Sequence, residues 1–416
     1  MPDGPDRLTA TQVADRLGVK VETVYAYVSR GYLASERSVD GRTSIFRPSD
    51  VDRLARRGRP RRTSRGPTID VNVETSITMI DASHVRYRGH DAVGLSRRAT
   101  YEQVASLLWA GELPSVPPRW GSGGPLPYRP EHGGTIERLR LAVALSALGA
   151  AAPSDGSGVG VANDPELFGR AGPDLIATMV GALPVLADDR PPRLHLGPDG
   201  PAAVRDSVAG RLSIRLQRRR PAPTVVSMVN AALVLLADHE MAPSTFAVRI
   251  AASVRADAAS VVEAGLGTVS GSLHGKASRH VRAFLDDAAA TSAAAAVDRW
   301  AAMPMGVPGT GHGLYRMGDP RGTELLARLR SSGGSARRLR LVEEVLAAIA
   351  ERDLGRPNID LALGAMGHVW AMSVDAGAAI FAVGRTAGWL AHAAEEYGRR
   401  PLRFRTRASY IGPRRR

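Results

Sequence analysis

Hydrophobic positions recur with helical spacing through most of the chain, and runs with strand-like alternation are few. Near the N-terminus the helical spacing predicts two short helices, at 9–17 and 19–29. Residues 33–46 alternate instead around Asp40-Gly41, a pair that favours a tight hairpin turn. A third helix is expected at 48–57. The predicted order is therefore helix, three-residue turn, helix, β wing and helix.

From about residue 69 onward the pattern is mostly helical, after one short hairpin candidate at 76–89. Further helices are predicted at 100–109, 135–150, 172–187, 200–217, 224–238, 244–269, 276–290, 322–330, 335–350 and 374–397. Loops rich in Gly and Pro interrupt this series at 113–134 and 151–164. No solenoid repeat and no glycine-rich phosphate fingerprint after a strand is present, so the pattern predicts an all-α domain.

Composition narrows the possible chemistry. The 416 residues leave room for about two or three domains. Cysteine is absent, which excludes disulfides, zinc–thiolate sites, iron–sulfur clusters and thiol nucleophiles. No signal segment and no apolar stretch of about 18 residues is visible, so a cytoplasmic protein without a membrane partner is expected.

The net charge of +14 is confined to the two ends of the chain. Residues 1–65 carry a net +6 and residues 399–416 carry +8, whereas the sequence between them is neutral. Residues 58–68 have no apolar periodicity and are expected to be a basic linker. The charge therefore indicates a possible phosphate-contacting N-terminal unit rather than a generally basic surface.

The N-terminal unit, residues 1–57, resembles winged helix-turn-helix domains of the mercury-resistance-regulator and excisionase type. The resemblance rests on 8–14 and 19–25, with Gly41-Arg42 and Phe46-Arg47 in the wing. It implies that the second helix enters the major groove of duplex DNA and that the wing touches the backbone. The expected DNA contacts are Lys20, Thr23, Tyr27, Arg30 and Arg42. The alternative is a module that docks a protein partner or the large domain.

Four histidines and one aspartate have unusual neighbours, although the signal at His84 is weak. His274 precedes a glycine, His312 lies between two glycines, and His239 follows an apolar helix. Asp360 comes just after a Pro-Asn turn. No His-x-x-x-His or similar ligand spacing is present, so no metal is expected.

Several segments, taken in order, resemble the citrate synthase family over residues 70–413. These segments are Ser76–Asp81, Arg86–Asp91, Glu102–Pro114, Ala237–Glu240, Leu273–Gly275, Gly311–Tyr315, Asp319–Arg321, Arg356–Asp360, Val383–Arg385 and Leu402–Arg405. The resemblance implies a mainly α fold, an all-helical two-domain enzyme of residues 69–416 that is a homodimer or larger. The large part would be 69–271 and 366–416, and the small part about 272–365, closing over substrate.

The resemblance also implies a reaction. An acyltransferase of this family condenses acetyl-CoA with oxaloacetate and water to give citrate and CoA, at the entry to the tricarboxylic acid cycle, with no cofactor. One alternative is 2-methylcitrate synthesis from propionyl-CoA, since a single methylene contributes only about 1–3 kcal/mol of discrimination. A second alternative is a DNA-binding regulator whose enzyme-like domain senses an oxoacid or acyl-CoA.

The roles of single residues follow from the same resemblance. Asp360 would be the base and His274 the donor to the thioester oxygen, while His312 would donate to the ketone carbonyl. The carboxylates of the oxoacid would be bound by His239, Arg321 and Arg385, with Arg405 from the other subunit. CoA would lie against the loop residues Val307, Pro308, Gly309 and Gly311.

Two features bear on turnover. A helix expected from Lys276 to Phe284 places His274 at its N-terminus, where the helix dipole favours a neutral imidazole. This chain departs from the usual family pattern at Lys276, Ser278 and Ala242. The resemblance therefore implies an active enzyme and leaves open an altered rate.

Overall fold

The structure is a computed structural model that describes residues 7–29, 33–38, 43–56, 72–123, 128, 132–149, 164–186, 193–196, 204, 206–271, 275, 277–315, 317–405 and 412. The chain divides into two units, Met1–Asn72 and Val73–Arg416, each with its own hydrophobic core. Among the described helices, none is long and apolar enough to cross a membrane. The expected cytoplasmic location stays a prediction.

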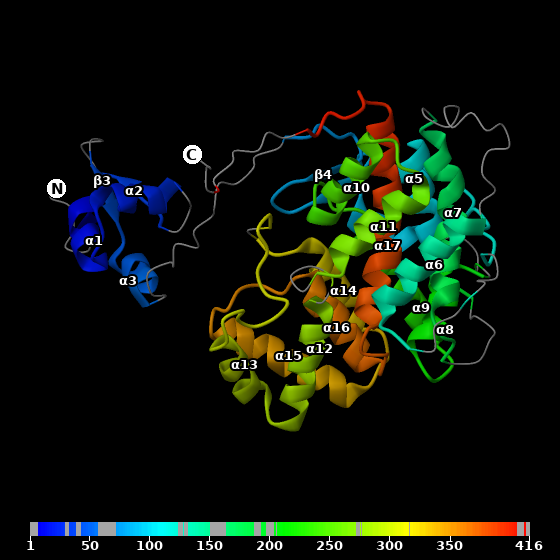
Figure 1. Cartoon of the computed structure of the whole chain (residues 1–416). Helices are drawn as coiled ribbons and strands as arrows, with labels where there is room; N and C mark the ends of the chain where they lie inside the picture. The colour runs from blue at the N-terminus through cyan, green and yellow to red at the C-terminus, as the bar shows by residue number, and fades with distance from the viewer. Residues whose placement is uncertain are drawn as a thin grey trace. The chain divides into compact units, whose positions relative to one another are not determined.

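The smaller unit has the order of elements that the sequence predicts (Figure 1). Its described elements are β1 (Leu8–Thr9), α1 (Ala10–Leu17), α2 (Val21–Ser29), β2 (Glu36–Arg37), β3 (Ser44–Phe46) and α3 (Pro48–Arg56). The side chain of Thr9 accepts from Gln12 N–H and the Gln12 side chain accepts from Thr9 N–H, a capping box that starts α1. Gly18, in the left-handed region at φ 61°, ends it. An unpredicted strand, β1, pairs with β3 beside the wing strand β2.

The core of this unit corrects one predicted DNA contact. Val24 and Tyr27 both lie in the core together with Phe46. Tyr27 comes three residues after Val24, on the same face of α2, and is only 9% exposed, so the prediction of an exposed Tyr27 is wrong. Tyr25 is the exposed aromatic side chain of α2.

The other predicted DNA contacts have different outcomes. Lys20 is exposed immediately before α2, where its carbonyl accepts from the N–H groups of Thr23 and Val24. Thr23 is partly exposed on α2. Arg30 and Arg42 lie outside the described residues.

The larger unit opens with a small antiparallel sheet. Strands β4 (Thr78–Ile80) and β5 (Val85–Tyr87) confirm the hairpin predicted at 76–89. A third strand, β6 (His90–Asp91), was not predicted and extends the sheet in the order β4-β5-β6.

The rest of the larger unit is helical, as predicted. Its described helices are α4 (Ala92–Arg98), α5 (Tyr101–Ala110), α6 (Thr135–Gly149), α7 (Glu166–Ala182), α8 (Val208–Leu216), α9 (Pro223–Leu236), α10 (Pro243–Ser253), α11 (Ala258–Val269), α12 (Ala277–Ala290), α13 (Ala293–Ala301), α14 (Pro320–Arg330), α15 (Ala336–Glu351), α16 (Ile359–Val369) and α17 (Ala376–Tyr397).

Several boundaries differ from the prediction for local reasons. The segment 244–269 forms two helices, because Arg255 adopts φ 63° and Asp257 caps the start of α11. In the segment 200–217 the helix begins only at Val208, after the cap Ser207. Helices α4, α13 and α16 were not predicted at all, and α16 carries Asp360.

Two groups of helices meet in this unit. Helix α17 is almost entirely buried and contacts α7, α9, α10 and α11 (Figure 1). Helices α12 to α16 pack on one another, and α14 and α16 also touch α9 and α17. The candidate site lies where these groups meet.

Candidate active site

His239 follows the C-terminal end of α9, where unpaired helix carbonyls need partners. The Tyr87 hydroxyl donates to the carbonyls of Leu235 (3.1 Å) and Asp238 (3.2 Å). Tyr87 is fully buried on β5, so the sheet fixes the direction in which the chain leaves α9. The segment that carries His239 is thereby held from one side.

Helix α17 holds the same helix end from the other side. Arg385 donates from Nε to the Leu236 carbonyl (2.8 Å), and Gly388 N–H donates to the Ala237 carbonyl (2.9 Å). A Cβ atom at Gly388 would lie 2.4 Å from that carbonyl oxygen, so glycine permits the close approach. Arg385 is 2% exposed, and its guanidinium charge lowers the pKa of the site carboxyl Asp360.

Three rings form the centre of the site. The Tyr315 hydroxyl and His239 Nε2 lie 2.8 Å apart. The ring of His312 lies 5.2 Å from that of His239 and 4.7 Å from that of Tyr315, measured between centroids. Two predicted site histidines, far apart in the sequence, are therefore neighbours.

The orientation of His312 is set by the chain that follows it. The Leu314 N–H donates to His312 Nδ1 (3.1 Å), so Nδ1 is the acceptor and the ring proton lies on Nε2. Partial burial, and then the Arg321 guanidinium, lower the pKa of His312. The ring is therefore a neutral imidazole that can donate a hydrogen bond from Nε2.

A buried ion pair carries Arg321 into the site. Arg321 donates from Nε and Nη2 to the two carboxylate oxygens of Asp319, each at 2.9 Å. Asp319 also caps α14 and accepts from Ile359 N–H (3.0 Å), the first residue of α16. One carboxylate therefore joins the starts of α14 and α16, and burial of the pair is compensated by this full set of bonds.

Asp360 lies in the first turn of α16. Asn358 caps this helix, and its side-chain oxygen accepts from the N–H groups of Asp360 (2.9 Å) and Leu361 (3.3 Å). Burial raises the pKa of the Asp360 carboxyl to about 6, while the guanidinium groups of Arg321 and Arg385 oppose the shift. A carboxyl group with this pKa can accept a proton near neutral pH.

The loop expected to contact CoA is joined to the turn before α16. Gly311 N–H donates to the Arg356 carbonyl (2.8 Å), and Asn358 N–H donates to the Gly309 carbonyl (2.9 Å). The Asn358 side chain adds a bond to the Gly311 carbonyl (2.9 Å). The loop and the cap of the Asp360 helix therefore form one hydrogen-bonded piece.

Position 309, in the loop that is hydrogen-bonded to the turn before α16, requires glycine. Its φ is +80°, and a Cβ atom there would lie 2.6 Å from Cβ of Leu361. Both the backbone conformation and the contact with α16 require glycine. Val307 is buried and Pro308 partly exposed in the same loop.

The structure brings most of the predicted site residues together. His239, His312, Arg321, Arg385 and Asp360 surround one region, and the loop with Val307, Pro308, Gly309 and Gly311 borders it through α16. Arg405 is exposed at the end of the chain's described C-terminal segment. His274 and Lys276 lie outside the described residues, and Ser278 is buried on α12.

Sequence reasoning did not select two functional groups. The Tyr315 hydroxyl, beside His239, and the Asp319 carboxylate, which orients Arg321, were noted only as parts of motifs. The Asp-Pro pair of Asp319 could have identified the second, because Asp and Pro together mark the cap and first residue of a helix. Among the described residues, no group of three His, Asp or Glu side chains could hold a metal ion.

Solved structures with a similar fold are citrate synthases. The enzyme from Thermoplasma acidophilum, determined as a ternary complex with carboxymethyl coenzyme A and oxaloacetate, has a TM-score of 0.65 and 23% identity, covering 83% of this chain and 96% of that one. The enzyme from Pyrobaculum aerophilum has a TM-score of 0.62 and 26% identity, covering 82% and 91%. The larger unit therefore has the mostly helical fold of citrate synthases.

Sequence comparison identifies the family. The family model described as citrate synthase, C-terminal domain, matches residues 70–119 and 133–407. Citrate synthase 2 of Bacillus subtilis is 27% identical, over 84% of this chain and 96% of that protein, and 2-methylcitrate synthase of Mycobacterium tuberculosis is also 27% identical, over 92% and 97%. The chain belongs to the citrate synthase family. A helix-turn-helix domain model matches residues 7–59.

Proposed function

We propose that the larger unit condenses acetyl-CoA with oxaloacetate and water to give citrate and CoA. The observation that carries the proposal is the convergence of Asp360, His312 and the two buried guanidinium groups of Arg321 and Arg385. The reaction needs a base for a weak carbon acid, a donor for a carbonyl oxygen and cations for a dicarboxylate.

Each step has a residue suited to it. The Asp360 carboxylate takes a proton from the acyl methyl group, while His274 donates to the thioester oxygen, a role that His274 receives from the family resemblance. The resulting enol carbon forms the new bond to the ketone carbon. His312 donates from Nε2 to the ketone oxygen as it becomes an alkoxide. Water then cleaves the thioester and releases CoA.

The oxoacid carboxylates would be held by Arg321 and Arg385, with His239 beside them. Arg321 is pre-oriented by Asp319, and Arg385 by the carbonyl at the end of α9. Planar guanidinium groups bind carboxylates through paired hydrogen bonds. The positions of both groups therefore favour a dianionic oxoacid over a neutral ketone.

Arg405 would complete the site from the second subunit of a homodimer. Its exposure at the end of a described segment is compatible with a role outside its own subunit. Mixing two inactive variants, Arg405→Ala and Asp360→Asn, tests this. Exchange of subunits should restore about a quarter of wild-type activity if Arg405 acts across the interface, and none if it acts within its own subunit.

The acyl group of the CoA substrate determines which product the enzyme makes. Propionyl-CoA, giving 2-methylcitrate, is the alternative, and relatives of both names match this chain at similar identity. The loop at 307–311 would face the adenine of CoA in either substrate and so would not distinguish the two. The ratio of kcat/KM for the two acyl-CoA substrates decides between them.

Release of CoA is the direct test. Because the chain has no cysteine, a thiol reagent reads only the CoA thiol and no protein background. Release that depends on oxaloacetate and is lost in Asp360→Asn is expected. If no CoA is released from either acyl-CoA although calorimetry shows binding of oxaloacetate, the proposed reaction is contradicted. That result would favour the alternative of a DNA-binding regulator that senses an oxoacid.

We propose further that the smaller unit binds duplex DNA. The helix-turn-helix match and the order of α1, α2 and the wing favour this function. Exposed Lys20 at the start of α2 is the described cation best placed to reach a phosphate. Arg7 and Arg47 both pair with Glu36, so part of the wing's positive charge is compensated within the unit.

Fluorescence anisotropy of the full chain with a labelled duplex tests the DNA proposal. Binding should weaken with salt, and Lys20→Ala should reduce the slope of log K against log salt by about 1. Arg16→Ala is the matched control, since Arg16 pairs with Asp52. Absence of binding at low salt would instead indicate a module that docks protein.

A further inference from the structure

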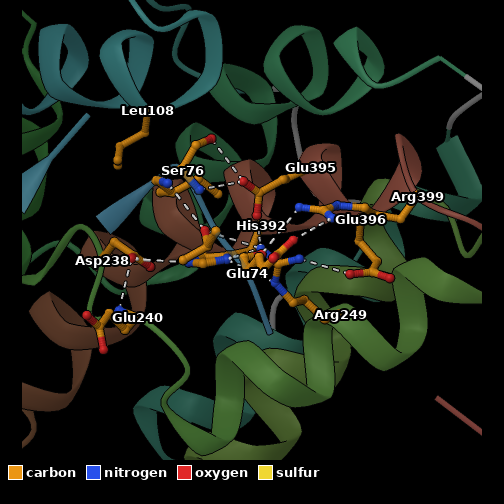
Figure 2. A network of polar contacts seen from close by, with 12 residues as sticks. Glu74, Ser76, Leu108, Asp238, Glu240, Arg249, His392, Glu395, Glu396 and Arg399 are labelled. Atoms are coloured by element: carbon orange, nitrogen blue, oxygen red, sulfur yellow. Dashed lines mark hydrogen bonds and ion pairs between the residues drawn. The ribbon is translucent and has the colours of Figure 1, made fainter. Parts of the chain in front are cut away.

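A network of buried polar side chains runs from Asp238 through His392 to Arg249 (Figure 2). Asp238, at the end of α9, contacts His392 on α17, and His392 contacts Arg249 on α10. All three side chains are 0% exposed. None of them has a role in the reaction proposed above, although Asp238 directly precedes His239.

The hydrogen bonds define the state of His392. Arg249 donates to His392 Nδ1 from Nε (3.1 Å) and Nη2 (2.8 Å). A guanidinium group can only donate, so Nδ1 carries no proton and Nε2 does. His392 Nε2–H therefore donates to Oδ2 of Asp238, 3.2 Å away.

The same carboxylate oxygen holds the turn that follows. Oδ2 of Asp238 accepts from Glu240 N–H (3.1 Å), so the two residues on either side of His239 are bonded to each other. Glu240 has a φ of 47°, in the left-handed region, which costs energy for a residue with a side chain. The Glu240 carboxylate is in turn fixed by Ile80 N–H (2.8 Å). Such a conformation persists only where its surroundings over-determine it.

Arg249, at the other end of this network, is held in place by several ion pairs and hydrogen bonds (Figure 2). Arg249 bonds Glu395, and its Nη1 donates to Glu396 at 2.9 Å. Glu395 accepts from Ser76 N–H (2.8 Å), and Glu396 accepts two bonds from Arg403 (2.5 and 2.6 Å). Buried ions are costly unless fully paired, and here the pairing ties α10, α17 and the C-terminal segment into one support.

We infer that His392 and Arg249 are positioning residues for the oxoacid side of the site. They fix Asp238, Asp238 fixes the strained turn through Glu240, and the turn sets the direction of the His239 imidazole. This inference rests on the proposed function, because it assumes that His239 contacts the oxoacid. The inference gives a role to buried side chains that do not themselves contact the reacting atoms.

Two variants of His392 separate positioning from packing. In His392→Gln the amide nitrogen can replace Nε2 and still donate to Asp238. In His392→Asn the amide oxygen can replace Nδ1 and accept from Arg249, but nothing reaches Asp238. His392→Asn should raise the KM for oxaloacetate about tenfold, with kcat and the KM for acetyl-CoA within twofold of wild type. His392→Gln should restore the oxaloacetate KM to within about threefold, and the exposed His280→Asn should change nothing.

The outcomes are distinct. Equal impairment of both variants in kcat and both KM values, following a fall in Tm, would overturn positioning in favour of packing alone. An unchanged oxaloacetate KM in His392→Asn would also overturn it. If His392→Asn does not fold, Asp238→Ala, which removes the acceptor of both bonds, tests the link from the other end and should give the same selective rise in oxaloacetate KM.

Calorimetric binding of oxaloacetate separates this inference from the proposed function. If wild type binds oxaloacetate without turnover, the proposed reaction fails, and the positioning role is judged by the Kd of each variant. If wild type neither turns over nor binds oxaloacetate, both proposals are overturned.

Discussion

Replacing Asp360 with asparagine should remove activity and also stabilise the protein. The substitution keeps the size of the side chain but removes a charge that is costly where it lies. Burial raises the pKa of this carboxyl from 3.8 to about 6, against the opposing effect of Arg321 and Arg385. The ionised form that proton abstraction needs is therefore also a cost to the folded state.

The size of that cost depends on pH. The unfolded chain releases the proton near pH 3.8 and the folded chain only near pH 6, so stability falls as pH rises between these values and stays reduced above them. At about 1.4 kcal/mol per pH unit, the difference reaches about 3 kcal/mol at pH 8. At pH 5, where the Asp360 carboxyl is mostly protonated in the folded state, the same linkage gives about half of that difference.

Urea denaturation followed by tryptophan fluorescence, at pH 5 and pH 8 and one protein concentration, measures this gap. Asp360→Asn should exceed wild type in unfolding free energy by the amounts above, and should lose about a thousandfold in kcat. Glu344→Gln, on the exposed side of α15, is the matched control and should be neutral at both pH values. A variant no more stable than wild type at pH 8, or a gap that does not shrink at pH 5, would refute the reasoning.

Three further substitutions test other parts of the structure. Gly309→Ala should lose about 1–3 kcal/mol of stability and raise the KM for acyl-CoA, because the added methyl group is strained by the positive φ and also collides with α16. At Gly311 the added methyl group would enter open space, so Gly311→Ala should lose less stability in thermal unfolding. Tyr315→Phe removes the hydroxyl beside His239 and should raise the oxaloacetate KM about tenfold in steady-state kinetics, with an unchanged KM contradicting that contact. Phe46→Ala should cost the smaller unit about 3–5 kcal/mol and abolish duplex binding in anisotropy while CoA release persists; parallel loss of both would contradict independent units.

The fold was predictable where the sequence pattern is local and strong. Helix α17 is long, with 22 residues, and Thr100 and Gly111 mark the ends of α5 clearly. Helix α16 was missed although it is as apolar as α17, because it is short and contains Gly364 and Gly367, which disfavour a helix. Its start at Asn358 and Asp360 was read instead as a turn.

The sequence indicated which residues belong to the candidate site better than it indicated how their side chains are arranged. Glycines around His312 and the position of Asp360 after Pro-Asn drew attention to these residues. The tautomer of His312 depends on one backbone N–H, and the orientation of Arg321 on a carboxylate two residues away, so both needed coordinates. Tyr27 was predicted to be an exposed DNA contact, but its side chain belongs to the core of the smaller unit.

The backbone pairing between the loop at 309–311 and the turn at 356–358 limits how this enzyme can diversify. A mutation that reshapes the loop also displaces the cap of the helix that carries Asp360, so gains in recognition would be offset by losses in turnover. Variation is freer at side chains that project from the loop without altering Gly309 or Gly311. We therefore expect sequence changes within this lineage to accumulate around the pair of segments, while the pair itself is inherited as one unit.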